Sequence, residues 1–160
     1  GPVVRVDRRG GDAGRAVGVT GRKDLVTVRQ TESEHIAATL ALLARARVPL
    51  FHADYGDGSA PVLTAWLALA DVPDWPAVRA EIAAIPGAQI IEERGAVSAV
   101  GHDVGGDAAA LSTLAQVAGA PSAAIDRLVC GPLRVTALCA ADRVDDLVRA
   151  AHRALCESAQ

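Results

Sequence analysis

Thr64-Ala65-Trp66-Leu67 recurs as Thr136-Ala137-Leu138-Cys139, at an offset of 72 residues (136 − 64). Other segments recur at almost the same distance: Val26-Thr27-Val28 with Val97-Ser98-Ala99, Val48-Pro49 with Ala120-Pro121, and Val78-Arg79-Ala80 with Val148-Arg149-Ala150. Offsets that agree this closely indicate two copies of one unit. The unit is too long for a solenoid repeat and has the length of a small α+β domain.

The first copy alternates short apolar strands with two amphipathic helices. Thr31 and Glu34 have the spacing of a capping box that opens the first helix, and Asp74 is expected to cap the second. The expected strands are Leu25–Gln30, Val48–Ala53, Val62–Ala70 and Gln89–Glu92, with a turn over residues 54–58. A further short strand, Ala16–Thr20, is expected before a turn over residues 21–24.

The second copy has the same order but lacks a closing strand, because the chain ends in a helix expected to be capped by Asp142. Its expected strands are Ala96–Val100, Ala123–Val129 and Leu133–Leu138. The order β-α-β-β-α-β is that of the ferredoxin-like fold, an antiparallel sheet with helices on one face. The strand at 16–20 is the candidate to complete the second copy. The domains expected are 25–93, and 15–20 with 94–160, after a linker or tag remnant at 1–14.

The composition limits the classes of function. Hydrophobic residues make up 51% of the chain and aromatic residues 2%, so the cores must consist of Ala, Val, Leu and Ile, with Trp66 and Trp75 expected in the core. A net charge of −3 and scattered arginines argue against a nucleic-acid partner. No apolar run is long enough for a membrane span, and no signal peptide is visible. The absence of methionine and the Gly1-Pro2 start suggest a piece of a longer protein or a processed subunit.

The cysteines and histidines provide no pattern typical of a metal or catalytic centre. Cys130, Cys139 and Cys156 have spacings that match no metal motif, and their odd number indicates free thiols in a reducing, cytoplasmic compartment. Cys139 is expected to be a buried apolar residue. His102-Asp103 is expected on a surface loop rather than as an acid/base pair. No nucleophile, base and orienting group can be assembled, so no catalytic residue, cofactor or metal is predicted.

Three segments resemble a known family. Ala16-Val17-Gly18-Val19-Thr20 with Leu25-Val26-Thr27-Val28 is similar to an opening strand pair, and Ala96-Val97-Ser98-Ala99-Val100-Gly101 to the first strand of a second domain. These segments resemble the tandem ACT domains at the C-terminus of aspartokinases, including their beta subunits. The resemblance implies that the first strand completes the second domain. It also implies a regulatory chain without a catalytic domain of its own.

The resemblance further implies an allosteric module in amino-acid biosynthesis that forms a homodimer and acts on an upstream kinase domain or a catalytic subunit. Its effector would be an amino acid, commonly lysine or threonine. Two alternatives stay open: a degenerate ACT pair that is only structural, and an independent small enzyme on a ferredoxin-like fold.

The effector site that the resemblance implies lies between the start of the first helix and the second strand. Its candidate residues here are Thr31, Glu32, Ser33, Glu34, Val48, Pro49, Leu50, His52 and Asp54. The helix start is shorter than the family's Asp-x-Pro-Gly loop and carries two carboxylates. Negative charge there opposes a carboxylate ligand. We therefore expect an ammonium group to be favoured, and lysine or threonine to bind weakly or not at all.

Overall fold

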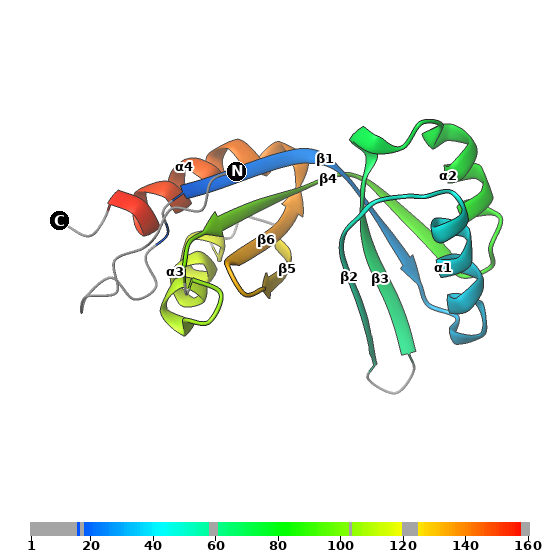
Figure 1. The fold of residues 1–160 in the computed structure, drawn as a ribbon, viewed down its shortest axis with the longest axis horizontal. Coiled ribbons are helices and arrows are strands. Elements are labelled where there is room, and N and C mark those ends of the chain that lie inside the picture. The colour runs from blue at the N-terminus through cyan, green and yellow to red at the C-terminus, as the bar shows by residue number, and fades with distance from the viewer. Residues whose placement is uncertain (1–15, 17, 58–60, 103, 120–124, 158–160) are drawn as a thin grey trace. The chain divides into compact units, whose positions relative to one another are not determined.

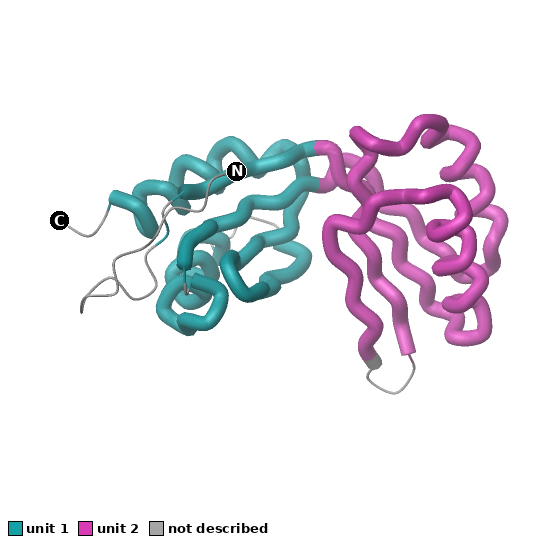
Figure 2. Tube along the Cα trace, viewed as in Figure 1, with its two compact units in different colours: residues 1–23, 95–160 teal, residues 24–94 magenta. Residues whose placement is uncertain are grey.

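The computed structural model describes residue 16 and residues 18–57, 61–102, 104–119 and 125–157. The linker expected at 1–14 and Asp103 of the His102-Asp103 pair lie outside the described residues. The chain divides into two compact units (Figure 2). We call residues 24–94 the α1–α2 unit, and residues 1–23 with 95–160 the α3–α4 unit.

Strands and helices follow the expected order (Figure 1). The elements are β1 (Gly18–Gln30), α1 (Ile36–Arg45), β2 (Leu50–Asp57), β3 (Pro61–Ala68), α2 (Trp75–Ala83), β4 (Ala88–Val100), α3 (Ala108–Ala118), β5 (Ile125–Cys130), β6 (Arg134–Ala140) and α4 (Val144–His152). Single 3₁₀ turns precede α1 (Ser33–His35), α2 (Leu69–Asp71) and α4 (Ala141–Arg143), and a π-helical segment, Arg153–Glu157, follows α4. No helix in the described ranges is long and apolar enough to cross a membrane.

The strand order confirms the α+β, ferredoxin-like fold class. Hydrogen-bonded neighbours follow the order β2-β3-β1-β4-β6-β5, and β1 and β4 each contribute residues to both units. The α1–α2 unit therefore has the order β2-β3-β1-β4. The α3–α4 unit has the order β1-β4-β6-β5, in which the N-terminal part of β1 takes the place of a fourth strand. This is the strand exchange that the sequence predicted.

Two of the predicted turns are wrong. Residues 21–24 continue β1 as one strand, and β2 continues through residues 54–57 to pair with Pro61. Gly21 serves close packing instead of a turn, because a Cβ there would lie 2.6 Å from Cγ1 of Val144. Gly95 is the matching position in β4, where a Cβ would lie 2.5 Å from Cγ2 of Val144. The start of α4 thus approaches both strands where each has only hydrogen as a side chain.

Each unit buries one face of its strands beneath its own two helices. In the α1–α2 unit the core combines strand residues with Leu42 and Leu43 of α1 and Val78 and Ile82 of α2. In the α3–α4 unit Leu114 of α3 and Leu147 of α4 pack on alternate residues of β4 and β6, among them Cys139. Cys139 is fully buried, as predicted. Trp66 is also buried, whereas Trp75 is partly buried against the α1–α2 core.

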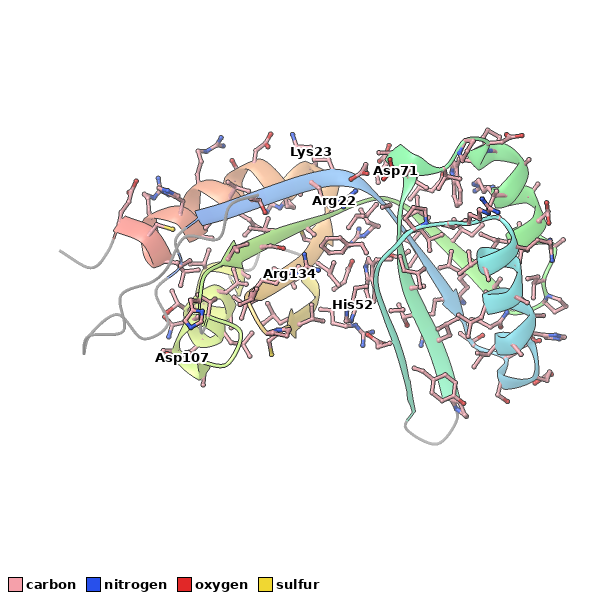
Figure 3. All side chains as sticks on the ribbon, in the orientation of Figure 1. Arg22, Lys23, His52, Asp71, Asp107 and Arg134 are labelled. Carbon is pink, nitrogen blue, oxygen red and sulfur yellow. The ribbon has the colours of Figure 1, made fainter. Side chains whose placement is uncertain are left out.

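The helix caps follow the sequence in part. Asp74 accepts a hydrogen bond from the backbone N–H of Ala77 at 3.4 Å, which confirms the predicted cap of α2. Asp107 caps α3 by accepting from Ala109 N–H at 2.8 Å (Figure 3). The predicted cap at Asp142 is wrong, because this residue lies inside the 3₁₀ turn before α4 and makes no capping hydrogen bond.

An ion pair links β1 to α4 within the α3–α4 unit. Lys23 Nζ lies 2.6 Å from Asp145 Oδ2, and both side chains are more than half exposed. This hydrogen bond holds the pKa of Asp145 below its usual value of 3.8. Exposed pairs contribute little to stability, so the fold does not depend on this contact.

Candidate functional site

The first group of predicted site residues, Thr31 to Glu34, lies between the end of β1 and the start of α1. Gln30, the last residue of β1, holds this segment in place through hydrogen bonds. Its side chain is fully buried. Gln30 Nε2 donates to Thr39 Oγ1 at 3.2 Å and to the carbonyl oxygen of Pro86 at 3.0 Å. Gln30 Oε1 accepts from the backbone N–H of Glu32 at 2.9 Å. A buried amide with all these partners fixes the backbone at Glu32.

Two more contacts fix the same segment. Thr39 Oγ1 donates to the carbonyl oxygen of His35 at 2.9 Å, so the network that starts at Gln30 also holds His35. The backbone N–H and the hydroxyl of Thr31 both lie 3.4 Å from the carbonyl oxygen of Gly87. Gly87 has a φ of +81°, and a Cβ there would lie 2.6 Å from Cγ of Glu32. A glycine is therefore required for both the conformation and the approach.

The predicted capping box at Thr31 and Glu34 is wrong. The 3₁₀ turn begins at Ser33, its N-cap is Glu32, and no side chain caps it or the α1 helix that follows. Thr31 lies too early for its hydroxyl to reach the free N–H groups and contacts Gly87 instead. The carboxylate of Glu34 is consequently not used in a cap.

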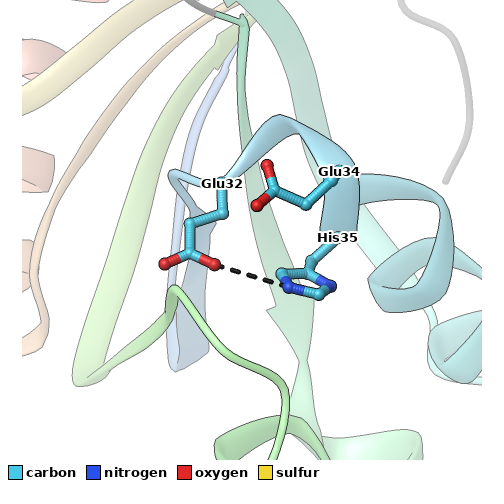
Figure 4. Close-up of side chains that lie close together, drawn as sticks. All are labelled: Glu32, Glu34 and His35. Atoms are coloured by element: carbon cyan, nitrogen blue, oxygen red, sulfur yellow. Dashed lines mark ion pairs between the residues drawn. The ribbon is translucent and has the colours of Figure 1, made fainter.

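The carboxylates of Glu32 and Glu34 form a cluster with the imidazole of His35 (Figure 4). One ligand atom from each of Glu32, Glu34 and His35 lies within 4.8 Å of the other two. His35 Nε2 is 3.5 Å from Glu32 Oε2, with side-chain exposures of 33% and 44%. The cluster therefore presents two carboxylates and an imidazole at the surface of the α1–α2 unit.

The second group, Val48, Pro49 and Leu50, connects α1 to β2. Val48 is buried in the core of the α1–α2 unit, and its N–H donates to the carbonyl oxygen of Leu43 at 3.0 Å. The carbonyl oxygen of Pro49 accepts from the N–H of Ala68 at 3.0 Å. The side chain of Leu50 is exposed. The N–H of Val48 and the carbonyl oxygen of Pro49 are thus used in hydrogen bonds within the α1–α2 unit.

The third group consists of His52, which Figure 3 labels, and Asp54, and both residues belong to β2. His52 Nε2 lies 3.5 Å from Asp54 Oδ2, and the His52 ring lies 5.5 Å from that of Trp66 at 46°. His52 and Asp54 pair with Trp66 and Thr64 of β3, which alternate with the core residues Ala65 and Leu67. Successive side chains of a strand point to opposite faces. This pair therefore lies on the sheet face away from α1 and α2.

The register separates these groups within the α1–α2 unit. Gln30, just before the first group, pairs with Leu63 of β3, whereas Leu50 pairs with Leu67. Four residues along a strand correspond to about 13 Å. The start of α1 and the start of β2 thus lie at opposite ends of the sheet, so a single copy of this unit does not bring them into one pocket.

The candidate residues predicted from the sequence included neither Gln30 nor His35. No local signal identifies Gln30, because its partners Thr39 and Pro86 become neighbours only through folding. His35 could have been found from the run Glu32-Ser33-Glu34-His35, which places three metal-ligating side chains on one turn. His102, from the predicted loop pair, is partly buried.

Comparison with known proteins identifies the fold. No protein-family model matches the sequence, and no curated protein matches it. The regulatory subunit of aspartate kinase from Thermus thermophilus, in its ligand-free form, superposes with a TM-score of 0.72 at 18% identity over 88% of this chain and 98% of that chain. The corresponding subunit from Thermus flavus gives 0.68 at 18% identity, with the same coverage. The chain has the fold of aspartate kinase regulatory domains.

This regulatory fold also occurs inside longer chains. Aspartate kinase from Clostridium acetobutylicum matches with a TM-score of 0.72 and 14% identity, over 89% of this chain and 35% of that chain. The matched region is thus a minor part of that enzyme. The aspartate kinase regulatory fold confirms the resemblance found in the sequence and the tandem ACT architecture.

Proposed function

We propose that this chain is the regulatory module of an aspartokinase-type enzyme and has no catalytic activity of its own. The observation that carries the proposal is the match to a separate regulatory subunit over 98% of that subunit's length. A fold match below 25% identity does not transfer function by itself, so the role is tested through ligand and partner binding.

The partner that this role requires is a kinase domain or a catalytic subunit. One matched structure is described as aspartokinase alpha and beta subunits, and it shares 13% identity with this chain. We propose an equivalent arrangement for this chain, with the kinase domain either preceding residue 1 or on a separate subunit.

A homodimer is the assembly that we propose for the regulatory role. Among the described residues, β2 and β5 are the outermost strands of the sheet, and an edge strand is a common site of pairing with another chain. Leu50 and Tyr55 are large apolar side chains exposed on β2. Sedimentation at micromolar concentration should give twice the monomer mass of 16.4 kDa. Replacing Tyr55 with lysine should weaken the dimer if β2 forms the contact, whereas a monomeric wild-type chain would contradict the assembly.

Amino-acid sensing is the finer function that we propose, with the start of α1 as the site. Glu32 and Glu34 favour the ammonium of a cationic amino acid over an acidic ligand. A ligand that binds only the folded state raises the melting temperature by mass action. We therefore expect one cationic amino acid at millimolar concentration to raise it, and acidic amino acids to have no effect. Lysine and threonine should show dissociation constants of about 1 mM or weaker.

The matched variants are Glu34→Gln, at the proposed site, and Glu81→Gln, an exposed carboxylate in the same unit that pairs with Arg45. Only Glu34→Gln should abolish the thermal shift, and a chelator in the buffer removes any contribution from metals. If no amino acid shifts the melting temperature, the alternative holds: a degenerate ACT pair with a structural role only. Micromolar lysine or threonine binding would contradict the expected weak affinity.

A further inference from the structure

The cluster of Glu32, Glu34 and His35 has the chemistry of a metal site. Two carboxylate oxygens and an imidazole nitrogen are common ligands of divalent transition metals. A tetrahedral zinc ion bonded at about 2.0–2.2 Å keeps its ligand atoms about 3.3–3.6 Å apart. His35 Nε2 and Glu32 Oε2 are already 3.5 Å apart, and all three ligand atoms lie within 4.8 Å of one another. To reach the zinc spacing, the ligand atoms that are farthest apart must approach each other by at most about 1.5 Å.

The imidazole distinguishes this cluster from a group of acidic side chains. Magnesium and calcium select oxygen ligands, whereas imidazole nitrogen suits zinc and its neighbours in the first transition series. His35 is the most buried of the three residues. Its donor nitrogen faces the Glu32 carboxylate (Figure 4).

The backbone beneath the cluster is held by buried groups. The Gln30 side chain accepts a hydrogen bond from the N–H of Glu32, and the Thr39 hydroxyl donates one to the carbonyl oxygen of His35. The side chains of Gln30 and Thr39 are also hydrogen-bonded to each other. Both residues have no exposed surface. Ligands whose main chain is fixed lose less conformational freedom on binding. The same network therefore sets the spacing of two of the three ligands.

We propose that Glu32, Glu34 and His35 bind one divalent first-row transition-metal cation, preferentially zinc. Three protein ligands leave an open coordination position that a water or an exogenous ligand can occupy. The cation uses the same two carboxylates as the ammonium group of the proposed effector, so the two ligands compete for the start of α1. The inference does not depend on an amino-acid effector, because the cation is tested without one.

Isothermal titration with zinc chloride tests the site, using chain that has been stripped of metal and carries Cys130→Ser to remove the exposed thiol. We expect one zinc ion per chain. Glu34→Gln and His35→Gln should each weaken binding at least about tenfold, since even the loss of an outer-shell partner typically costs 10–100-fold. The control is His152→Gln, which removes an exposed histidine paired at 3.2 Å with the single carboxylate of Glu157. That variant should bind zinc as tightly as its parent.

The second experiment is competition with magnesium, which should not displace the bound zinc. Circular dichroism is the folding control and should show that every variant is folded. The proposal is overturned if the parent binds no zinc, if His35→Gln binds as tightly as the parent, or if His152→Gln loses the ion. If magnesium displaces zinc and His35→Gln binds zinc as tightly as the parent, the three residues are only an acidic cluster without metal selectivity.

Discussion

Replacing Gly105 with alanine should unfold the α3–α4 unit at ordinary temperatures or leave it close to unfolding. A Cβ at this position would overlap the carbonyl oxygen of Gly131 and lie 2.6 Å from its carbonyl carbon. It would also lie 3.0 Å from the carbonyl carbon of Pro132. All of these atoms belong to the main chain, so no side chain can rotate away. Overpacking typically costs about 1–3 kcal/mol and occasionally more, and we expect the upper end here.

The loop has no simple way to move away. Val104, the preceding residue, is fully buried in the core of the α3–α4 unit, and its N–H contacts the carbonyl oxygen of Gly101 at 3.3 Å. Gly131 is held by a hydrogen bond from its N–H to the carbonyl oxygen of Arg134 at 2.8 Å. A shift of either segment therefore disturbs packing or a backbone contact.

Urea denaturation measures the effect, with Gly131→Ala as the matched control. A Cβ at Gly131 meets no atom within 4 Å, although the two glycines face each other. Gly105→Ala should lose about 3 kcal/mol of unfolding free energy, while Gly131→Ala should change it little. Equal midpoints for the two variants would mean that the Gly105 loop is not packed as described.

The fold could be predicted because the pattern that encodes it is local. Residues 135–139 of β6 are all buried, and a short, mostly apolar run of this kind is typical of a strand that is covered on both faces. The strand exchange followed from counting: a copy that ends in a helix has one strand too few, and the segment before the first copy could supply it.

Other features depend on contacts that the sequence does not show. Gly21 reads as a turn residue, yet it lies within β1 because α4 packs against it. The site residues were grouped by their order along the chain, whereas the register sets Leu50 opposite Leu67 and Gln30 opposite Leu63. Gln30 became recognisable only through its contact with Pro86, 56 positions further along the chain. Distances of this kind follow from the packing and not from spacing.

Deleting residues 1–20 should strongly destabilise the α3–α4 unit, although the structure describes only a few of the residues removed. Ala16 is buried in the core of that unit, and its N–H contacts the carbonyl oxygen of Leu155 at 3.2 Å. Val19 packs against the same core. The deletion also removes Gly18–Thr20 of β1, the neighbour of β4 in the sheet. The truncated unit would expose its apolar core and an unpaired strand edge, which promotes aggregation.

The control is deletion of residues 1–14, which retains Ala16 and β1. Removing a strand and its buried contacts should cost about 3 kcal/mol or more, and a domain of this size then melts about 12–24 °C lower. Thermal unfolding and sedimentation of both truncations measure the loss of stability and the aggregation. We expect the shorter deletion to melt like the full chain. If the longer deletion is equally soluble and melts at the same temperature, β1 is dispensable to the α3–α4 unit and its exchange into that unit has no energetic role.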